Sequence, residues 1–263
     1  MIKESYLMVD ALAQRDNLFT RTDARIKVAL SILAFAAILG FLGFKFPTGI
    51  FILTVAAMLF IKTPAKLMVG RILAPMVLGT AVFLFLLFFQ GGYPIFTVHI
   101  FGLKLVGYRE GLLLGTTVLT RIAASVSLLL LLSVTTPIHE LGYALIWMRF
   151  PKVIVEIMLL TYRYLFVLWD EGLRIRQAQI LRMGYPNRRS LDGWKLSLKS
   201  TSTLMGMVFI RAYDRAESTF SAMQVRAYNG NMTGNHYEKW NKSQTKFFVS
   251  GLVVLLALAA ISI

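Results

Sequence analysis

Two arginines, each near the end of a basic helical segment, are the side chains in this sequence best placed to bind another molecule. Arg182 lies near the end of segment 161–184, and Arg226 near the end of segment 203–228. The planar guanidinium group can bond a carboxylate or backbone carbonyls of a partner. A cation near a helix C-terminus is also favoured by the helix dipole, so ordinary capping is the alternative for either arginine. Two similar ends favour docking of one partner type that is present twice.

Other kinds of chemistry have little support in the sequence. There is no cysteine, so thiolate metal sites and disulfides are excluded. The glycine-rich nucleotide-binding loop that ends in Gly-Lys-Ser or Gly-Lys-Thr is missing, and Gly111–Thr117 lacks its lysine. His99, His139 and His236 are widely separated, and no paired carboxylates suggest acid–base catalysis. We therefore expect no catalytic residue, no metal site and no cofactor.

The composition indicates a membrane protein. Hydrophobic residues make up 57% of the 263 positions, and 28 Lys and Arg against 13 Asp and Glu give a net charge of +15. A basic nucleic-acid-binding protein would lack apolar runs of bilayer length, so nucleic acid is not an expected partner. Excess positive charge instead fits the positive-inside rule of membrane proteins.

Five apolar segments predict an all-α, polytopic membrane protein with about five transmembrane helices, since a spanning helix needs about 20 mostly apolar residues. A further apolar stretch, Lys152–Leu168, is interrupted by Glu156 and Arg163, and we interpret it as interfacial. The five predicted spans are Ile26–Phe44, Phe46–Ile61, Ile72–Phe89, Gly111–Val134 and Phe247–Ile263.

The distribution of charge predicts orientation and domain organisation. The loop 62–71 and the segment 163–246 are rich in Lys and Arg, whereas Lys104 is the only Lys or Arg in the segment 90–107. Because basic loops stay in the cytoplasm, we expect a membrane region at 1–134, a cytoplasmic or interfacial insertion of long helices at 135–246, and a final transmembrane helix at 247–263.

Helix start and stop signals within the insertion predict three helices. A capping threonine in Thr135-Thr136 followed by Pro137 is a typical helix start, and Phe150-Pro151 ends that helix. A second helix is expected at 152–183, before Gly184, and a third at 194–228.

Arg121 lies in the middle of a predicted span, where an ionisable group is costly and faces protein or water. An internal pair with Glu110 or Glu156 is the structural interpretation. A contact between subunits or a transport path is the functional one.

Several motifs resemble one known family. Tyr162–Glu171 with Arg174, Arg176 and Arg182, the second signature Arg211–Tyr228, Asp23–Lys27 and Ser133–Pro137 are similar to the transmembrane T component (EcfT/CbiQ family) of energy-coupling factor (ECF) transporters. The similarity is greatest to the CbiQ branch, which is associated with cobalt or nickel uptake. It covers nearly the whole chain in order.

The resemblance implies a non-catalytic subunit of the cell membrane with several partners. These are two cytoplasmic ATP-binding cassette ATPases and a membrane S component that binds the metal ion. The lipid bilayer surrounds the membrane part of the chain. Long coupling helices would end in Ala-Arg-Gly-like motifs that dock on the ATPases. The matching positions are Leu181-Arg182-Met183, with Gly184 one place on, and Val225-Arg226-Ala227, so the first motif has methionine and the second has alanine where glycine is usual.

Three other functions remain open from the sequence. A T component for a vitamin differs from one for a metal ion mainly through its S component, a separate chain. An autonomous secondary carrier would transport without ATPases, although intramembrane acids are nearly absent. A membrane enzyme would need clustered carboxylates or histidines.

Overall fold

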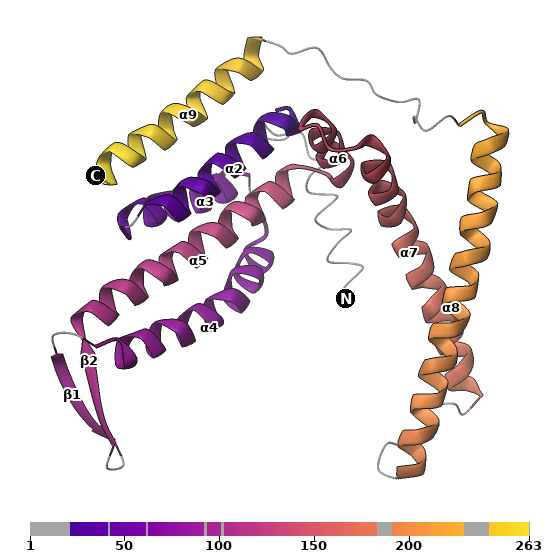
Figure 1. Ribbon diagram of the computed structural model, residues 1–263, viewed down its shortest axis with the longest axis horizontal. Coiled ribbons are helices and arrows are strands. Elements are labelled where there is room, and N and C mark those ends of the chain that lie inside the picture. The colour runs from indigo at the N-terminus through magenta and orange to yellow at the C-terminus, as the bar shows by residue number, and fades with distance from the viewer. Residues whose placement is uncertain are drawn as a thin grey trace. The chain divides into compact units, whose positions relative to one another are not determined.

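The structure is a computed structural model that describes residues 22–41, 43–61, 63–91, 94–100, 103–182, 191–228 and 242–262 (Figure 1). Apart from one β-hairpin, its regular elements are helices, which confirms the all-α prediction. The elements are α2 (Ala24–Gly40), α3 (Lys45–Phe60), α4 (Ala65–Phe89), β1 (Pro94–Ile100), β2 (Leu103–Tyr108), α5 (Arg109–Thr135), α6 (Ile138–Trp147), α7 (Lys152–Leu181), α8 (Leu191–Val225) and α9 (Lys242–Ser262).

The chain divides into two compact units, each described by itself below. The first contains residues up to Ala144 together with Glu238–Ile263, and the second is Leu145–Tyr237. The functional boundaries expected at 134/135 and 246/247 stay a prediction. The helices themselves cross both positions, because α5 continues to Thr135 and α9 begins at Lys242.

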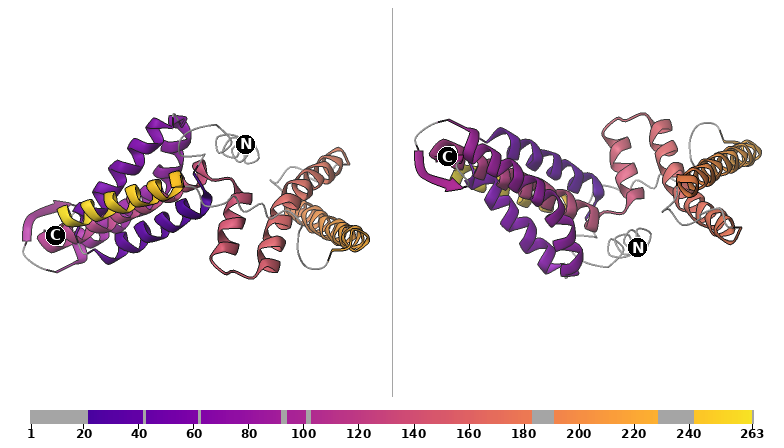
Figure 2. Two further views of the ribbon diagram at one scale, coloured as in Figure 1. Left: turned by 90° about the horizontal axis from the view of Figure 1, so that it is seen from above. Right: turned by 90° about the horizontal axis from the view of Figure 1, so that it is seen from below.

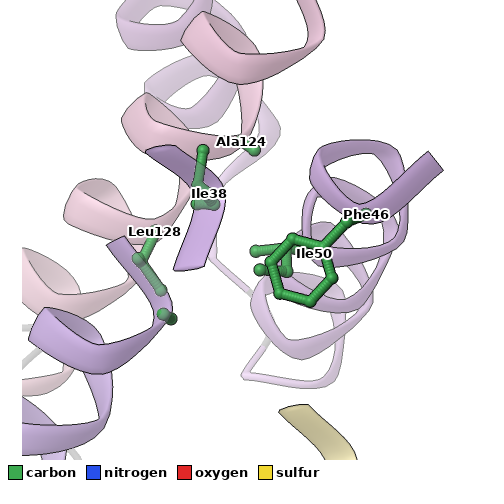
Figure 3. Close-up of a cluster of buried hydrophobic side chains, with 6 residues drawn as sticks. Ile38, Phe46, Ile50, Ala124 and Leu128 are labelled. Atoms are coloured by element: carbon green, nitrogen blue, oxygen red, sulfur yellow. The ribbon is translucent and has the colours of Figure 1, made fainter. Parts of the chain in front are cut away.

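Helix α5 is the centre of the first unit. It packs against α2, α3 and α4, while α9 packs against α2 and α3. The buried side chains of the main cluster meet where α2, α3 and α5 approach one another (Figure 3). Ring stacking of Phe41 on Phe46, with centroids 4.6 Å apart, closes the turn between α2 and α3. The buried members of the cluster are Ala34, Ile38, Phe46, Ile50, Ala124 and Leu128.

Glycine allows α5 to approach α4 closely. A Cβ atom on Gly111 would lie 2.3 Å from the carbonyl oxygen of Leu86, and one on Gly115 would lie 2.8 Å from the ring of Phe83. Any larger residue at Gly111 would therefore force the two backbones apart.

Two buried polar contacts join helices of this unit. The hydroxyls of Thr54 and Ser127 are hydrogen-bonded at 2.7 Å, between α3 and α5. Lys27 donates from Nζ to the carbonyl oxygen of Thr135 at 2.9 Å, so a cation satisfies an end carbonyl of α5.

By length and composition, three described helical stretches can cross a membrane: Met68–Phe89, Arg109–Thr135 and Gln244–Ile261. The shorter apolar helix Lys45–Phe60 and the 17-residue α2 correspond to the other two predicted spans. Large apolar side chains of α4, including Leu78 and Phe89, are mostly exposed, as expected of a surface that faces lipid or a membrane partner. The polytopic character is thus confirmed, and the number five stays a prediction.

Three local predictions are wrong. Most of the expected loop 62–71 is helical, because α4 begins at Ala65, directly after Pro64. The loop 90–107 contains the antiparallel hairpin of β1 and β2, which was not anticipated. Threonine capping of α6 is absent at Thr136, whose buried hydroxyl has no hydrogen-bond partner within the described part of the chain.

Candidate partner-docking site on helices α7 and α8

Helices α7 and α8 form an antiparallel pair, and they cross in both views of Figure 2. Contacts occur near both ends and at the centre, and the residue numbers fall on one helix as they rise on the other. The side-chain hydrogen bonds are Tyr228 to Glu156 at 2.5 Å, Tyr164 with Thr219 at 3.0 Å, and Gln179 to the Ser200 carbonyl at 3.1 Å.

Polar side chains of α7 and α8 also contact one another between the two ends of the pair. The ring of Tyr164 lies beneath the guanidinium of Arg215, whose Cζ is 5.8 Å from the ring centroid. One turn away, Arg211 forms an ion pair with Glu171. Because Arg211 is about half exposed, we expect this ion pair to contribute little to stability.

The pair has two different grooves. One has a volume of about 900 Å³ and a mixed lining, in which arginines, acids and hydroxyls lie beside apolar side chains such as Leu160 and Met223. Arg226 is among its lining residues. The other, about 450 Å³, is lined mostly by apolar side chains that include Ile157, Leu165 and Phe220. The first groove therefore offers charged as well as apolar contacts, whereas the second offers mainly apolar ones.

The first predicted docking end is exposed. Helix α7 ends at Leu181, whose side chain is 86% exposed, and Arg182 is exposed beside it. The N–H of Arg182 donates to the carbonyl of Ala178 at 3.2 Å, as in a regular last turn. Met183 and Gly184 lie outside the described residues.

The second predicted docking end is exposed too, and its backbone has a defined turn. Val225 is 88% exposed, and Arg226 and Ala227 are exposed. Ala227 has φ 54°, the left-handed region that glycine favours. Its N–H donates to the Gln224 carbonyl, and the next N–H, of Tyr228, donates to the Met223 carbonyl, both at 3.0 Å. This is the Schellman arrangement. Ala227 thus adopts the backbone conformation for which glycine is common after a helix.

The two arginines lie at opposite ends of the pair. Tyr228 contacts Glu156, so Arg226 is level with about residue 158 of α7. At 1.5 Å per residue, Arg182 is then roughly 36 Å further along the axis. Two exposed helix ends separated in this way can contact two bodies at once.

Arg121 has a different role. In the first unit its Nη2 atom donates to the carbonyl of Phe41, the C-cap of α2, at 2.6 Å, whereas its Nε has no hydrogen-bond partner among the described residues. The expected acidic partner is replaced by a backbone carbonyl, and Glu156 accepts from Tyr228 in the second unit. Arg121 therefore joins α5 to the end of α2.

The bond between Tyr228 and Glu156 is the contact that the sequence did not indicate. It joins residues 72 positions apart, and it raises the pKa of the Tyr228 phenol above its ordinary value through the hydrogen bond to the carboxylate, with smaller contributions from burial and from the carboxylate's charge.

No group of three His, Cys, Asp or Glu side chains in the described ranges is arranged to hold a metal ion. Within the second unit, the exposed arginines at the helix ends and the two grooves are features that can bind a partner.

Comparisons with known proteins match the whole region that holds these features. A family model described as cobalt transport protein, CbiQ, matches residues 16–237. An uncharacterized protein of Methanocaldococcus jannaschii is 32% identical over 188 residues, 71% of this chain and 68% of that protein. A putative fused cobalt transport protein CbiMQ of Methanocorpusculum labreanum is 34% identical over 181 residues, 67% of this chain but only 29% of its own length. An energy-coupling factor transporter transmembrane protein EcfT of Macrococcus caseolyticus is 28% identical over 204 residues, 67% of this chain and 76% of that protein.

Proposed function

Because the chain belongs to the cobalt transport protein (CbiQ) family of transmembrane T components of ECF transporters, we propose that it couples ATP hydrolysis by partner subunits to the uptake of cobalt ions. T components are multi-pass proteins of the cell membrane and are not enzymes. ATP is hydrolysed by the ATPase partners, and a separate S component captures the substrate.

The observation that carries the coupling role is the pair of exposed arginines at opposite ends of α7 and α8. Two ATPase subunits each receive one helix end, Arg182 on one and Arg226 on the other. The guanidinium groups bond carboxylates or carbonyls in grooves of the ATPases. The flanking residues Leu181, Met183, Gly184, Val225 and Ala227 complete the two docking motifs.

Movement of the docked ends changes the surface that the chain offers to the S component. Residues 1–134 and 247–263 form the membrane part in this proposal, and 135–246 form the cytoplasmic coupling part. When ATP brings the ATPases together, α7 and α8 move with them, and the S component reorients and releases its substrate inside the cell.

Cobalt is the proposed substrate because the family description and the name of the fused relative both refer to cobalt transport. The fused relative is far longer than this chain, which supports a membrane partner that acts together with such a segment. The S component decides between cobalt, nickel and a vitamin, so its identity after co-purification tests the substrate proposal.

Charge reversal at the helix ends tests the docking proposal. The variant that carries both Arg182→Glu and Arg226→Glu is expected to lose the ATPases on affinity purification and to lose substrate uptake. Arg176→Glu is the matched control, since Arg176 is also exposed on α7 but lies before its last turn. Undiminished ATPase co-purification and uptake in the double variant would refute the docking proposal.

A further inference from the structure

A hydrogen bond joins the end of α8 to the beginning of α7. The hydroxyl of Tyr228 donates to Oε2 of Glu156 at 2.5 Å, a length typical of a bond between a hydroxyl and a carboxylate. The Glu156 side chain is only 8% exposed, whereas Tyr228 is half-buried. A hydrogen bond to a charged, buried acceptor is stronger than an ordinary surface contact.

This bond restrains Arg226 as well as Tyr228, because backbone hydrogen bonds fix the conformation of residues 226–228. The N–H of Tyr228 donates to the Met223 carbonyl, which folds residue 228 back onto the last turn of α8. The left-handed conformation of Ala227 makes that reversal. When the Tyr228 side chain is attached to α7, the last turn of α8, which carries Arg226, is attached as well.

Apolar contacts hold only one side of this turn, where the half-buried Met223 lines both grooves. Val225, directly before Arg226, is 88% exposed. Helix ends fray readily when few buried contacts hold them. A partner that binds a frayed end must first order it, which lowers its affinity.

Building on the docking function proposed above, we propose that Tyr228 and Glu156 are positioning residues that hold the Arg226 end ready for one ATPase subunit. Neither residue needs to touch the ATPase.

The test measures how Tyr228 is coupled to each arginine. The protein is reconstituted in nanodiscs, and the dissociation constant of the purified ATPase pair is measured for Tyr228→Phe, Arg226→Ala, Arg182→Ala and the two double variants that contain Tyr228→Phe. Loss of a hydrogen bond to a charged group is expected to weaken ATPase binding about tenfold.

The double variants separate positioning from general stability. Adding Tyr228→Phe to Arg226→Ala is expected to give no further loss, because the end being positioned no longer docks. Adding it to Arg182→Ala is expected to give the full additional loss, because that end lies at the other limit of the pair. A purely structural role would add to both arginine variants alike.

Variants at Glu156 provide a second line of evidence. Glu156→Gln keeps an oxygen acceptor and is expected to retain more ATPase affinity than Glu156→Ala, and the difference should disappear in the Tyr228→Phe background. Size-exclusion profiles and melting curves establish that each variant is folded.

The outcomes for this proposal and for the docking function are distinguishable. If both arginine variants weaken ATPase binding while Tyr228→Phe is neutral, or is additive with both of them, the positioning role is overturned and docking stands. If neither arginine variant affects binding, docking itself is overturned and the positioning role is overturned with it.

Discussion

Replacement of Ala227 by glycine tests the left-handed turn that ends α8. A left-handed conformation is unfavourable by about 1 to 2 kcal/mol for a residue with a Cβ atom. Glycine removes that strain but makes the unfolded chain more flexible, which offsets about 0.4 to 1 kcal/mol. At φ 54° the change should therefore stabilise the end of α8 by about 0.5 to 1 kcal/mol.

Hydrogen exchange measures this change where it occurs. The amides of residues 227 and 228 both donate within the turn, so they exchange only when the turn opens. We expect their exchange in Ala227→Gly to be about twofold to fivefold slower than in the parent protein. Peptides that cover residues 223–228 in reconstituted protein report this rate by mass spectrometry.

A second alanine-to-glycine change, at Ala216, is the matched control, and it is expected to lower local stability. Ala216 is exposed in the middle of α8, where the backbone is right-handed. Ala216→Gly should destabilise that helix locally by about 1 kcal/mol and make exchange there faster. Unchanged or faster exchange at residues 227 and 228 in Ala227→Gly would refute the strained turn.

Two further predictions concern other contacts. Gly111→Ala places a Cβ atom 2.3 Å from the Leu86 carbonyl oxygen and should lower the melting temperature by several degrees. Gly70→Ala is the control, because a Cβ atom there has nothing within 4 Å, and it should leave the melting temperature unchanged. Equal melting temperatures of the two variants would contradict the close approach of α4 and α5. For Tyr228 the pKa is raised in the folded state, so the stability that its bond to Glu156 contributes is present below the phenol's ordinary pKa and is lost as pH rises through the folded value. Absorbance titration against Tyr228→Phe should place this phenol's ionisation above that of an ordinary tyrosine, and ionisation at the ordinary pKa would count against the bond.

The fold was predictable where long apolar runs decide it. A run such as Gly111–Val134 has few alternatives to a helix, and the structure extends it only slightly, to Arg109–Thr135. Prediction failed where charge was given more weight than backbone preference. Lys66 and Arg71 suggested a loop, yet both follow Pro64 and are good helix formers, so α4 begins at Ala65.

The sequence pointed to the two helix ends, which the structure shows exposed, but it did not predict the contacts around them. Arg182 and Arg226 stand out because a lone arginine near a helix end has a recognisable setting. Nothing local pairs Tyr228 with Glu156, because that bond depends on how α7 and α8 align. Similarly, Arg121 donates to the carbonyl of Phe41 and not to an acid. The sequence around Arg121 does not indicate this partner, because the position of the end of α2 depends on the tertiary fold.

The opposite directions of α7 and α8 have a mechanical consequence. Their C-terminal ends lie at opposite limits of the pair, and packed helices have axes about 8–10 Å apart. Two equal and opposite forces applied at these ends along offset lines produce no net displacement, but they form a couple that generates a torque. The ion pair between Arg211 and Glu171 lies near the midpoint between the two ends, where such a torque is centred.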